Sequence, residues 1–157
     1  MTEPMTPQPP IPGGSQWAPS GPSGPRAGFW RRFAAAFLDG VILGVPIFVL
    51  AVIVDSDAIG ALYVVAGIAY FTYFEGSESG QTVGKRALGI RVIDFRTGGP
   101  IGYGRAAIRW IGRILSSIPC YLGYLWLLWD KEKQTWHDKL ANDVVVPVDA
   151  YPVSSWP

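Results

Sequence analysis

The chain has 157 residues, of which 49% are apolar and 16% are charged, and its mean hydropathy is +0.23. This composition is typical of a membrane protein with one small domain. The formal net charge of +1 offers no electrostatic basis for binding nucleic acid, so we expect no nucleic-acid partner. The single cysteine, Cys120, excludes an intrachain disulfide framework.

Residues 1–27 are predicted to form a disordered tail. Of the first 25 residues, 15 are Pro, Gly or Ser, a composition that cannot bury a core. The segment has neither an apolar stretch nor a basic start, so it does not resemble a signal peptide.

Two apolar runs follow and predict a transmembrane helical hairpin. Residues 33–54 contain one charge, Asp39, and as a helix would span about 33 Å, enough for a hydrocarbon core of about 30 Å. Residues 59–74 carry no charge and would span about 24 Å. The turn between them is predicted at 55–57. Asp39 would lie about 9 Å inside the first helix, where a carboxylate is costly to keep.

The distribution of basic residues predicts a cytoplasmic N-terminus. Three arginines precede the first helix, none lies in the following turn, and six basic residues lie between Glu75 and Trp110. Cytoplasmic loops carry such an excess of Lys and Arg.

A third apolar segment, predicted as helix at 105–129, allows two topologies. Arg105, Arg109 and Arg113 recur every four residues and would share one helix face. An amphipathic helix in the membrane interface fits this pattern, and so does a tilted span that begins near Ile111 with Arg113 reaching back to the headgroups. Whether the segment crosses or re-enters stays open, and so does the side of the C-terminus.

The polar middle of the chain predicts a small cytoplasmic β-hairpin. Residues 88–94 alternate loosely, residues 97–100 supply a turn, and residues 101–103 could return. Residues 144–148 are also β-prone and could add a strand. In that case both ends of the third segment lie on one face, and the segment re-enters. The fold class is thus an all-α membrane protein with a helical hairpin, a third apolar helical segment and a small β-hairpin.

No motif predicts an enzyme, a cofactor or a metal site. The run Gly80 to Arg86 differs from a phosphate-binding loop, because three residues instead of four separate its glycines and Arg86 follows the lysine. The one histidine, His137, has no second imidazole or thiolate nearby in sequence. A nucleophile and base pair is not recognisable either.

The chain resembles the RDD family of bacterial membrane proteins from Gly28 to about Val146. The family is named for one arginine and two aspartates, which by motif position correspond to Arg32, Asp39 and Asp138. The resemblance implies a bacterial plasma-membrane protein with two or more spans and no settled molecular function, for which a role in transport has been suggested. The matching residues are Gly28-Phe29-Trp30-Arg31-Arg32, Asp39-Gly40, Gly80-Gln81-Thr82-Val83-Gly84-Lys85-Arg86, Gly89-Ile90-Arg91-Val92, Arg109 and His137-Asp138-Lys139-Leu140-Ala141.

One departure from the family pattern lies near the C-terminus. Where the pattern usually continues as Ala-Gly-Thr, this chain has Ala141-Asn142-Asp143. Asn142 can replace glycine in a left-handed turn. Asp143 in place of threonine puts in doubt any role that depended on a hydroxyl group there.

The buried carboxylate of Asp39 needs a partner. Arg32 lies seven residues earlier, about 10.5 Å along the helix axis, which is too far for a direct pair unless both side chains reach. Arg109 and Arg113 are the expected ion-pair partners. Asp39 then either fixes helix packing or belongs to a polar site for an ion or small solute. For Asp138 the alternatives are a turn or cap residue, a salt bridge to Arg32, or a substrate contact.

Ala36, Gly40 and Gly44 form a seam of small residues on the first helix, which would let another helix approach closely. That helix could be the second span, through Ala66 or Gly67, or one from a second copy of the protein.

The sequence therefore predicts three segments: the tail 1–27, a membrane domain 28–148 and a C-terminal tail 149–157. Two functions are compatible with it. The protein could transport an ion or small solute as an oligomer, because three helices cannot enclose a pathway alone. Alternatively, it could be a non-catalytic adaptor whose basic cytoplasmic hairpin holds a partner or anionic lipid.

Overall fold

The computed structural model describes residues 24–54, 58–119, 121–153 and 155–157. The predicted tail up to residue 23, the predicted turn at 55–57 and Cys120 lie outside the described residues. In chain order the elements are α1 (Phe29–Ile53), α2 (Ala58–Gly76), α3 (Val83–Ala87), β1 (Ile90–Asp94), α4 (Gly102–Ser117), α5 (Leu122–Leu125), the 3₁₀ helix η1 (Trp126–Leu128), α6 (Trp136–Ala141) and β2 (Asp143–Pro147).

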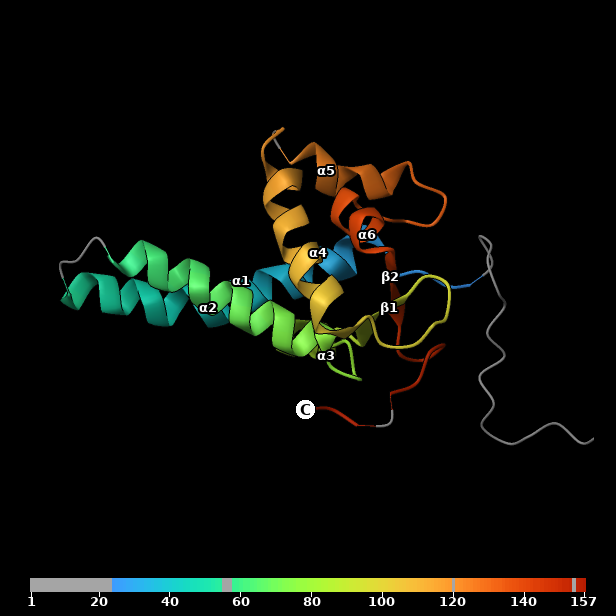
Figure 1. The fold of residues 1–157 in the computed structure, drawn as a ribbon, viewed down its shortest axis with the longest axis horizontal. Helices are drawn as coiled ribbons and strands as arrows, with labels where there is room; N and C mark the ends of the chain where they lie inside the picture. Colours follow the sequence, from blue (N-terminus) through green and yellow to red (C-terminus); the bar gives the residue numbers. More distant parts are fainter. Residues whose placement is uncertain (1–23, 55–57, 120, 154) are drawn as a thin grey trace, which may run out of the picture.

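Helices α1 and α2 lie side by side and extend away from all the other elements (Figure 1). Both are long and apolar enough to cross a membrane. Within α1, which the structure describes in full, only Ala35 and Asp39 are buried. An apolar helix left uncovered in this way is suited to lipid rather than water. The two apolar helices predicted from the sequence are thus confirmed.

The sheet pairs two distant strands. β1 and β2 are antiparallel, with Val92 opposite Val145. The predicted return strand at 101–103 is wrong, because these residues lead into α4, and Gly102 has a φ of 74°. Three consecutive valines in β2 supply the apolar strand that can be buried. The pairing with 144–148, which the sequence left open, is therefore the one that forms.

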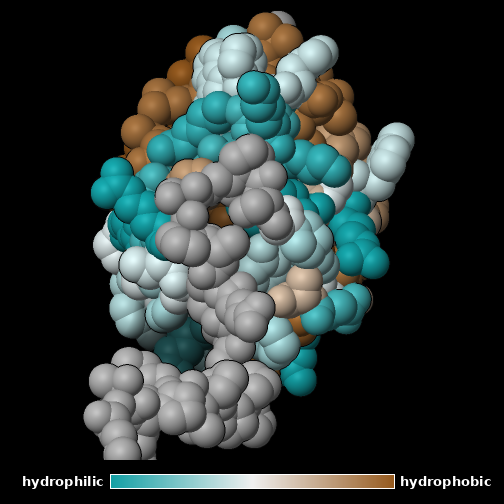
Figure 2. All heavy atoms as spheres, turned by 90° about the vertical axis from the view of Figure 1, so that its right-hand side faces the viewer, coloured by the Kyte–Doolittle hydropathy of each residue, from teal (hydrophilic) through white to brown (hydrophobic). Residues whose placement is uncertain are grey.

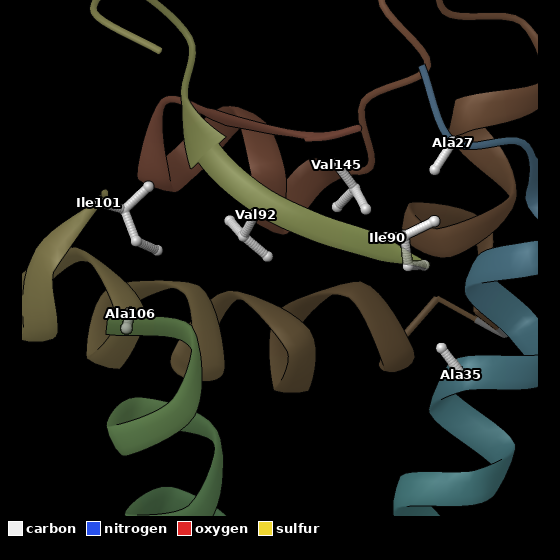
Figure 3. Packing of buried hydrophobic residues seen from close by; sticks show 7 residues of the cluster. All are labelled: Ala27, Ala35, Ile90, Val92, Ile101, Ala106 and Val145. Atoms are coloured by element: carbon white, nitrogen blue, oxygen red, sulfur yellow. The ribbon is translucent and has the colours of Figure 1, made fainter. Parts of the chain in front are cut away.

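A small apolar core lies between the sheet, α1 and α4 (Figure 3). In that view Ile90 of β1 lies on the side of α1, and Val92 of β1 and Val145 of β2 lie between it and Ala106 of α4. These four side chains are buried. The core positions the amino-terminal half of α4 against the sheet. Its other members are Ala27, Ala35 and Ile101.

The third apolar segment is broken rather than continuous. α4 ends at Ser117, and the following pair α5 and η1 runs at 112° to it. Pro119 follows directly after the helical residue Ile118, and its ring removes the backbone N–H that would continue the helix. In Figure 1, α4 runs across the direction of the α1–α2 pair. Its large aliphatic side chains point outward, with Ile111 54% and Leu115 51% exposed.

The two ends of the folded chain meet. The backbone N–H of Ala27, just before α1, donates to the carbonyl of Val145 in β2 at 2.9 Å. The start of α1 and the last strand therefore lie at the same end of the molecule. Figure 2 views that end, opposite the tip of the hairpin, and its described atoms are mainly hydrophilic, with apolar atoms toward the rim.

Candidate functional site

The carboxylate of Asp39 is fully buried and joins three helices. One oxygen accepts hydrogen bonds from the Tyr70 hydroxyl of α2 at 2.7 Å and from the Gly84 backbone N–H of α3 at 2.8 Å. The other accepts from the Thr82 hydroxyl at 2.6 Å. Three donors on two other elements stabilise the buried charge.

The loop from Gly80 to α3 approaches α1 closely because it contains glycine. A Cβ atom on Gly84 would lie 2.2 Å from the carbonyl oxygen of Ala35. Gly80 has a φ of 62°, and a Cβ atom there would lie 2.1 Å from the carbonyl oxygen of Val92. Thr82 then caps the amino terminus of α3. Both glycines are required by backbone geometry.

Two further contacts hold the same loop. The Gln81 side-chain amide donates to the carbonyl of Ile90 in β1 at 2.9 Å. From the C-terminal tail, the Trp156 indole N–H donates to the Gln81 carbonyl at 3.1 Å, and its ring stacks on Phe74 at 5.3 Å. The loop is therefore fixed from α1, β1 and the C-terminal tail.

A second polar cluster is centred on Arg109 of α4, whose side chain is 2% exposed. Its Nη1 lies 2.7 Å from Oδ1 of Asp138 and also contacts Asp143. Its Nε lies 3.2 Å from Oε2 of Glu75. One guanidinium group thus connects the end of α2, the start of α6 and the start of β2.

Two of these carboxylates have further cationic partners. Glu75 is 2.5 Å from Nζ of Lys85 and also contacts Arg113. Asp138 is 2.5 Å from Nη1 of Arg32. Asp138 also accepts a hydrogen bond at 2.9 Å from the backbone N–H of Thr135, as part of a capping box that starts α6.

The pKa values of the two aspartates that share Arg109 are shifted in opposite directions. Burial raises the pKa of Asp138, but Arg109 and Arg32 outweigh it and hold that pKa well below the usual range. Asp143 has Arg109 alone among these cations, so burial, reinforced by the charge of Asp138, raises its pKa well above the usual range.

His137 packs against α4 and also lines the cavity described below. Its Nδ1 lies 3.2 Å from the Ser116 hydroxyl, and its ring lies 4.9 Å from that of Tyr124. Among the residues that the structure describes, no group of three His, Cys, Asp or Glu side chains is arranged to hold a metal ion.

A cavity of about 500 Å³ lies between the α1–α2 pair and the α4–α6 region, a size common for ligand sites. Within the described chain its lining contains four cationic side chains and one carboxylate, while Glu75, Asp138 and Asp143 do not line it. Aromatic and aliphatic side chains form most of the remainder. The charged lining residues are Arg32, Asp39, Lys85, Arg109 and Arg113.

The structure brings two of the three signature residues together. Arg32 pairs with Asp138, one of the alternatives left open by the sequence. Arg109 and Arg113 do not supply the partner expected for Asp39. Their stripe on α4 faces Glu75 and the α6 region instead, and the loop before α3 reaches Asp39 with uncharged donors.

The small-residue seam of α1 is left uncovered. A Cβ atom on Gly40 or Gly44 would meet no described atom within 4 Å. On α2, Gly67 faces the indole of Trp110 at 3.5 Å and not the seam. Ala36 and Gly40 instead line the cavity.

Three residues of the site were not predicted from the sequence: Glu75, Asp143 and Tyr70. Glu75 is fully buried, and its signal was a carboxylate at the end of an apolar run just before the Gly80 loop. Asp143 was noticed only as a departure from the family pattern. Tyr70 carried no signal, because aromatic residues are common near the ends of membrane helices.

Known proteins resemble this chain over different lengths. A proline-rich antigen homolog of Mycobacterium tuberculosis is 36% identical over 87 residues, which cover 54% of this chain and 36% of that protein. The proline-rich antigen of Mycobacterium leprae is 33% identical over 78 residues, covering 50% and 31%. The uncharacterized protein YxaI of Bacillus subtilis is 26% identical over 147 residues, covering 76% and 96%. No solved structure matches the chain.

The chain thus spans about a third of the length of the proline-rich antigens that it matches. The RDD family matches residues 26–142, which include the Asp39 site, the Gly80 loop and the Arg109 cluster except Asp143. This match confirms the resemblance inferred from the sequence: the chain belongs to the RDD family.

Proposed function

We propose that this protein is a multi-pass protein of the bacterial plasma membrane that binds a small anionic solute in the cavity and, as an oligomer, takes part in its transport. The proposal assigns it no catalytic step, no cofactor and no nucleic-acid partner. The observation that supports this proposal is the cavity itself, whose described lining contains four cationic side chains and one carboxylate.

The arrangement of charges favours an anion over a cation. Asp39 already accepts three hydrogen bonds, so its charge is compensated by the protein. Glu75 and Asp138 pair with the lining cations from outside the cavity, so the charged groups that line it are mainly cationic. An anion that entered would meet guanidinium and ammonium groups in a site of low polarity, where their attraction is strong.

The topology that we propose has both ends of the domain in the cytoplasm. The hydrogen bond between Ala27 and Val145 supports an even number of crossings. α1 and α2 would cross, while α4 would lie in the interface with its arginines inward and its apolar face toward lipid. The basic residues before α1 favour the cytoplasm for the N-terminus.

Cysteine labelling in intact cells tests this topology. In a Cys120→Ser background, Val54→Cys places a thiol at the exposed end of α1, and Ala150→Cys places one after β2. A membrane-impermeant maleimide should label the first in intact cells and the second only after permeabilisation. Labelling of both in intact cells would contradict the proposed topology.

Uptake into proteoliposomes tests the transport function. Two spanning helices of one chain cannot enclose a pathway, so we propose an oligomer and expect cross-linking to trap one. Uptake of phosphate, sulfate or acetate should exceed that of empty liposomes and fall at least tenfold in Lys85→Gln, with exposed Lys131→Gln as the matched control. Uptake of Na⁺ or K⁺ alone would refute an anion site.

A second candidate function, a non-catalytic membrane adaptor, is favoured by the way Asp39 ties α1 to the loop before α3. Asp39→Asn separates the two functions. A transporter that depends on this group should lose activity or its pH dependence while assembly survives. An adaptor should lose assembly or respond little.

A further inference from the structure

The cavity is elongated along α1. Its lining residues on that helix run from Phe29 to Leu43, a distance of about 21 Å at 1.5 Å per residue. A compact inorganic anion would occupy only a small part of this length.

The polarity of the lining changes along the same direction. Along α1 the lining passes from Arg32 through Asp39 to Gly40 and Leu43, which mark an apolar end. Lys85 of α3 and Arg113 of α4 add cationic groups to the lining. Two buried N–H groups of lining residues, Arg32 Nε and Arg113 Nη1, have no hydrogen-bond partner among the described residues. Buried donors are normally satisfied, so a small movement of either side chain toward the cavity would let it donate to a bound acceptor.

The apolar end has room and access. A Cβ atom on Gly40 would meet no described atom within 4 Å. Tyr63 of α2, about two turns nearer the hairpin tip than Tyr70, also lines the cavity and is 47% exposed. The cavity is therefore continuous with the apolar outer surface that would face lipid.

We propose that the cavity binds a single-chain anionic amphiphile with a phosphate head, drawn from the membrane. The phosphate would accept hydrogen bonds from Arg32, Arg113 and Lys85, and the alkyl chain would run along α1 past Gly40 to Leu43. This inference rests on the proposed function, in that it names the class of anion that the cavity takes.

Binding of dodecyl phosphate to the full chain in phosphatidylcholine nanodiscs tests the proposal. Inorganic phosphate serves as the head without a tail, and dodecanol as the tail without a charge. Bound ligand is counted by mass spectrometry, and the melting temperature is followed in parallel. Dodecyl phosphate should bind saturably and raise the melting temperature, whereas the other two at equal concentration should not.

Variants then assign the binding to the cavity. Gly40→Phe fills the apolar end without touching a charge and should weaken dodecyl phosphate binding at least tenfold. Gly60→Phe on α2 also has open space at its Cβ and does not line the cavity, so it should bind normally. Arg113→Gln should weaken binding, and Arg105→Gln on the same helix, which pairs with Asp94, should not.

Each contrary result has a defined meaning. Equal binding of inorganic and dodecyl phosphate, unaffected by Gly40→Phe, would overturn the amphiphile and leave the anion site standing. Failure of both to bind would overturn the proposed anion site as well. Equal loss in both glycine variants, or a Gly40→Phe protein that changes its oligomeric state and still binds, would also overturn the assignment.

Discussion

Arg32 and Asp138 are 106 positions apart in the chain, and their side chains are 2.5 Å apart in the structure. The pair joins the first turn of α1 to the first turn of α6. Arg32 also donates to the carbonyl of Lys133 at 2.9 Å. Two of the three residues that the resemblance assigns to the family's name thus fasten the apolar hairpin to the end of the domain.

Replacing Arg32 should unfold this junction. Arg32→Gln leaves Asp138 with Arg109 alone, and breaking one side of a buried pair should lower the free energy of unfolding by about 3 kcal/mol. The neighbouring exposed residue gives a matched control, because Arg31→Gln should change stability by less than about 0.5 kcal/mol. Thermal unfolding in mild detergent measures both; equal melting temperatures would refute the role of the pair.

Asp39→Asn should loosen the loop before α3 from α1. An amide has one acceptor oxygen, so at least one of the donors Tyr70, Thr82 and Gly84 loses its partner. We expect a loss of about 1–3 kcal/mol in unfolding free energy and faster hydrogen exchange of the Gly84 amide. An unchanged exchange rate would contradict the role of Asp39 as an anchor.

Gly84→Ala tests the close approach of α3 to α1. The added methyl group would lie 2.2 Å from the carbonyl oxygen of Ala35, so the helices must separate at a cost of about 1–3 kcal/mol. Gly60→Ala, whose Cβ meets nothing within 4 Å, should have no such cost. Comparing the two melting temperatures isolates the steric effect, and a stable Gly84→Ala protein would exclude it.

Acid should destabilise the fold through His137. Burial holds the pKa of His137 well below its usual value; Asp138 opposes this, whereas Arg109, Arg113 and Arg32 add to it. The neutral ring makes its full contribution to the free energy of unfolding at pH values above the unfolded pKa of about 6.5. As the pH decreases below that value, this contribution is lost by up to about 1.4 kcal/mol per pH unit. Melting curves between pH 7 and 5 should show this loss, and His137→Gln should reduce it.

Asp143 should change the free energy of unfolding with pH in the opposite direction to His137. Because burial raises its pKa in the folded protein, its contribution is present below the unfolded pKa and is lost as pH rises through the folded pKa. Removing this group with Asp143→Asn should therefore steepen the acid loss caused by His137. A flatter stability profile in Asp143→Asn than in the parent protein would show that the pKa of Asp143 is not raised.

The sequence could predict what depends on local patterns. The apolar runs identified α1 and α2, the four-residue spacing placed three arginines on one face of α4, and Asn142 does end α6 with a φ of 53°. It left the strand pairing open, because α4, α5 and α6 separate β1 from β2 in the chain and a local pattern cannot choose between distant partners. The partners of Asp39 are uncharged donors that leave no pattern, which is why arginines were expected instead.

The ion pair between Arg32 and Asp138 can form only late in synthesis, after the ribosome has added the residues between them. A ribosome that adds about 5–20 residues per second needs roughly 5–20 s to pass from the arginine to the aspartate. During that interval the hairpin can already be inserted while Arg32 awaits its counter-charge. A nascent chain interrupted before α6 would keep Arg32 without Asp138 and leave Arg109 with Glu75 alone, and membrane proteases could distinguish it from the finished product.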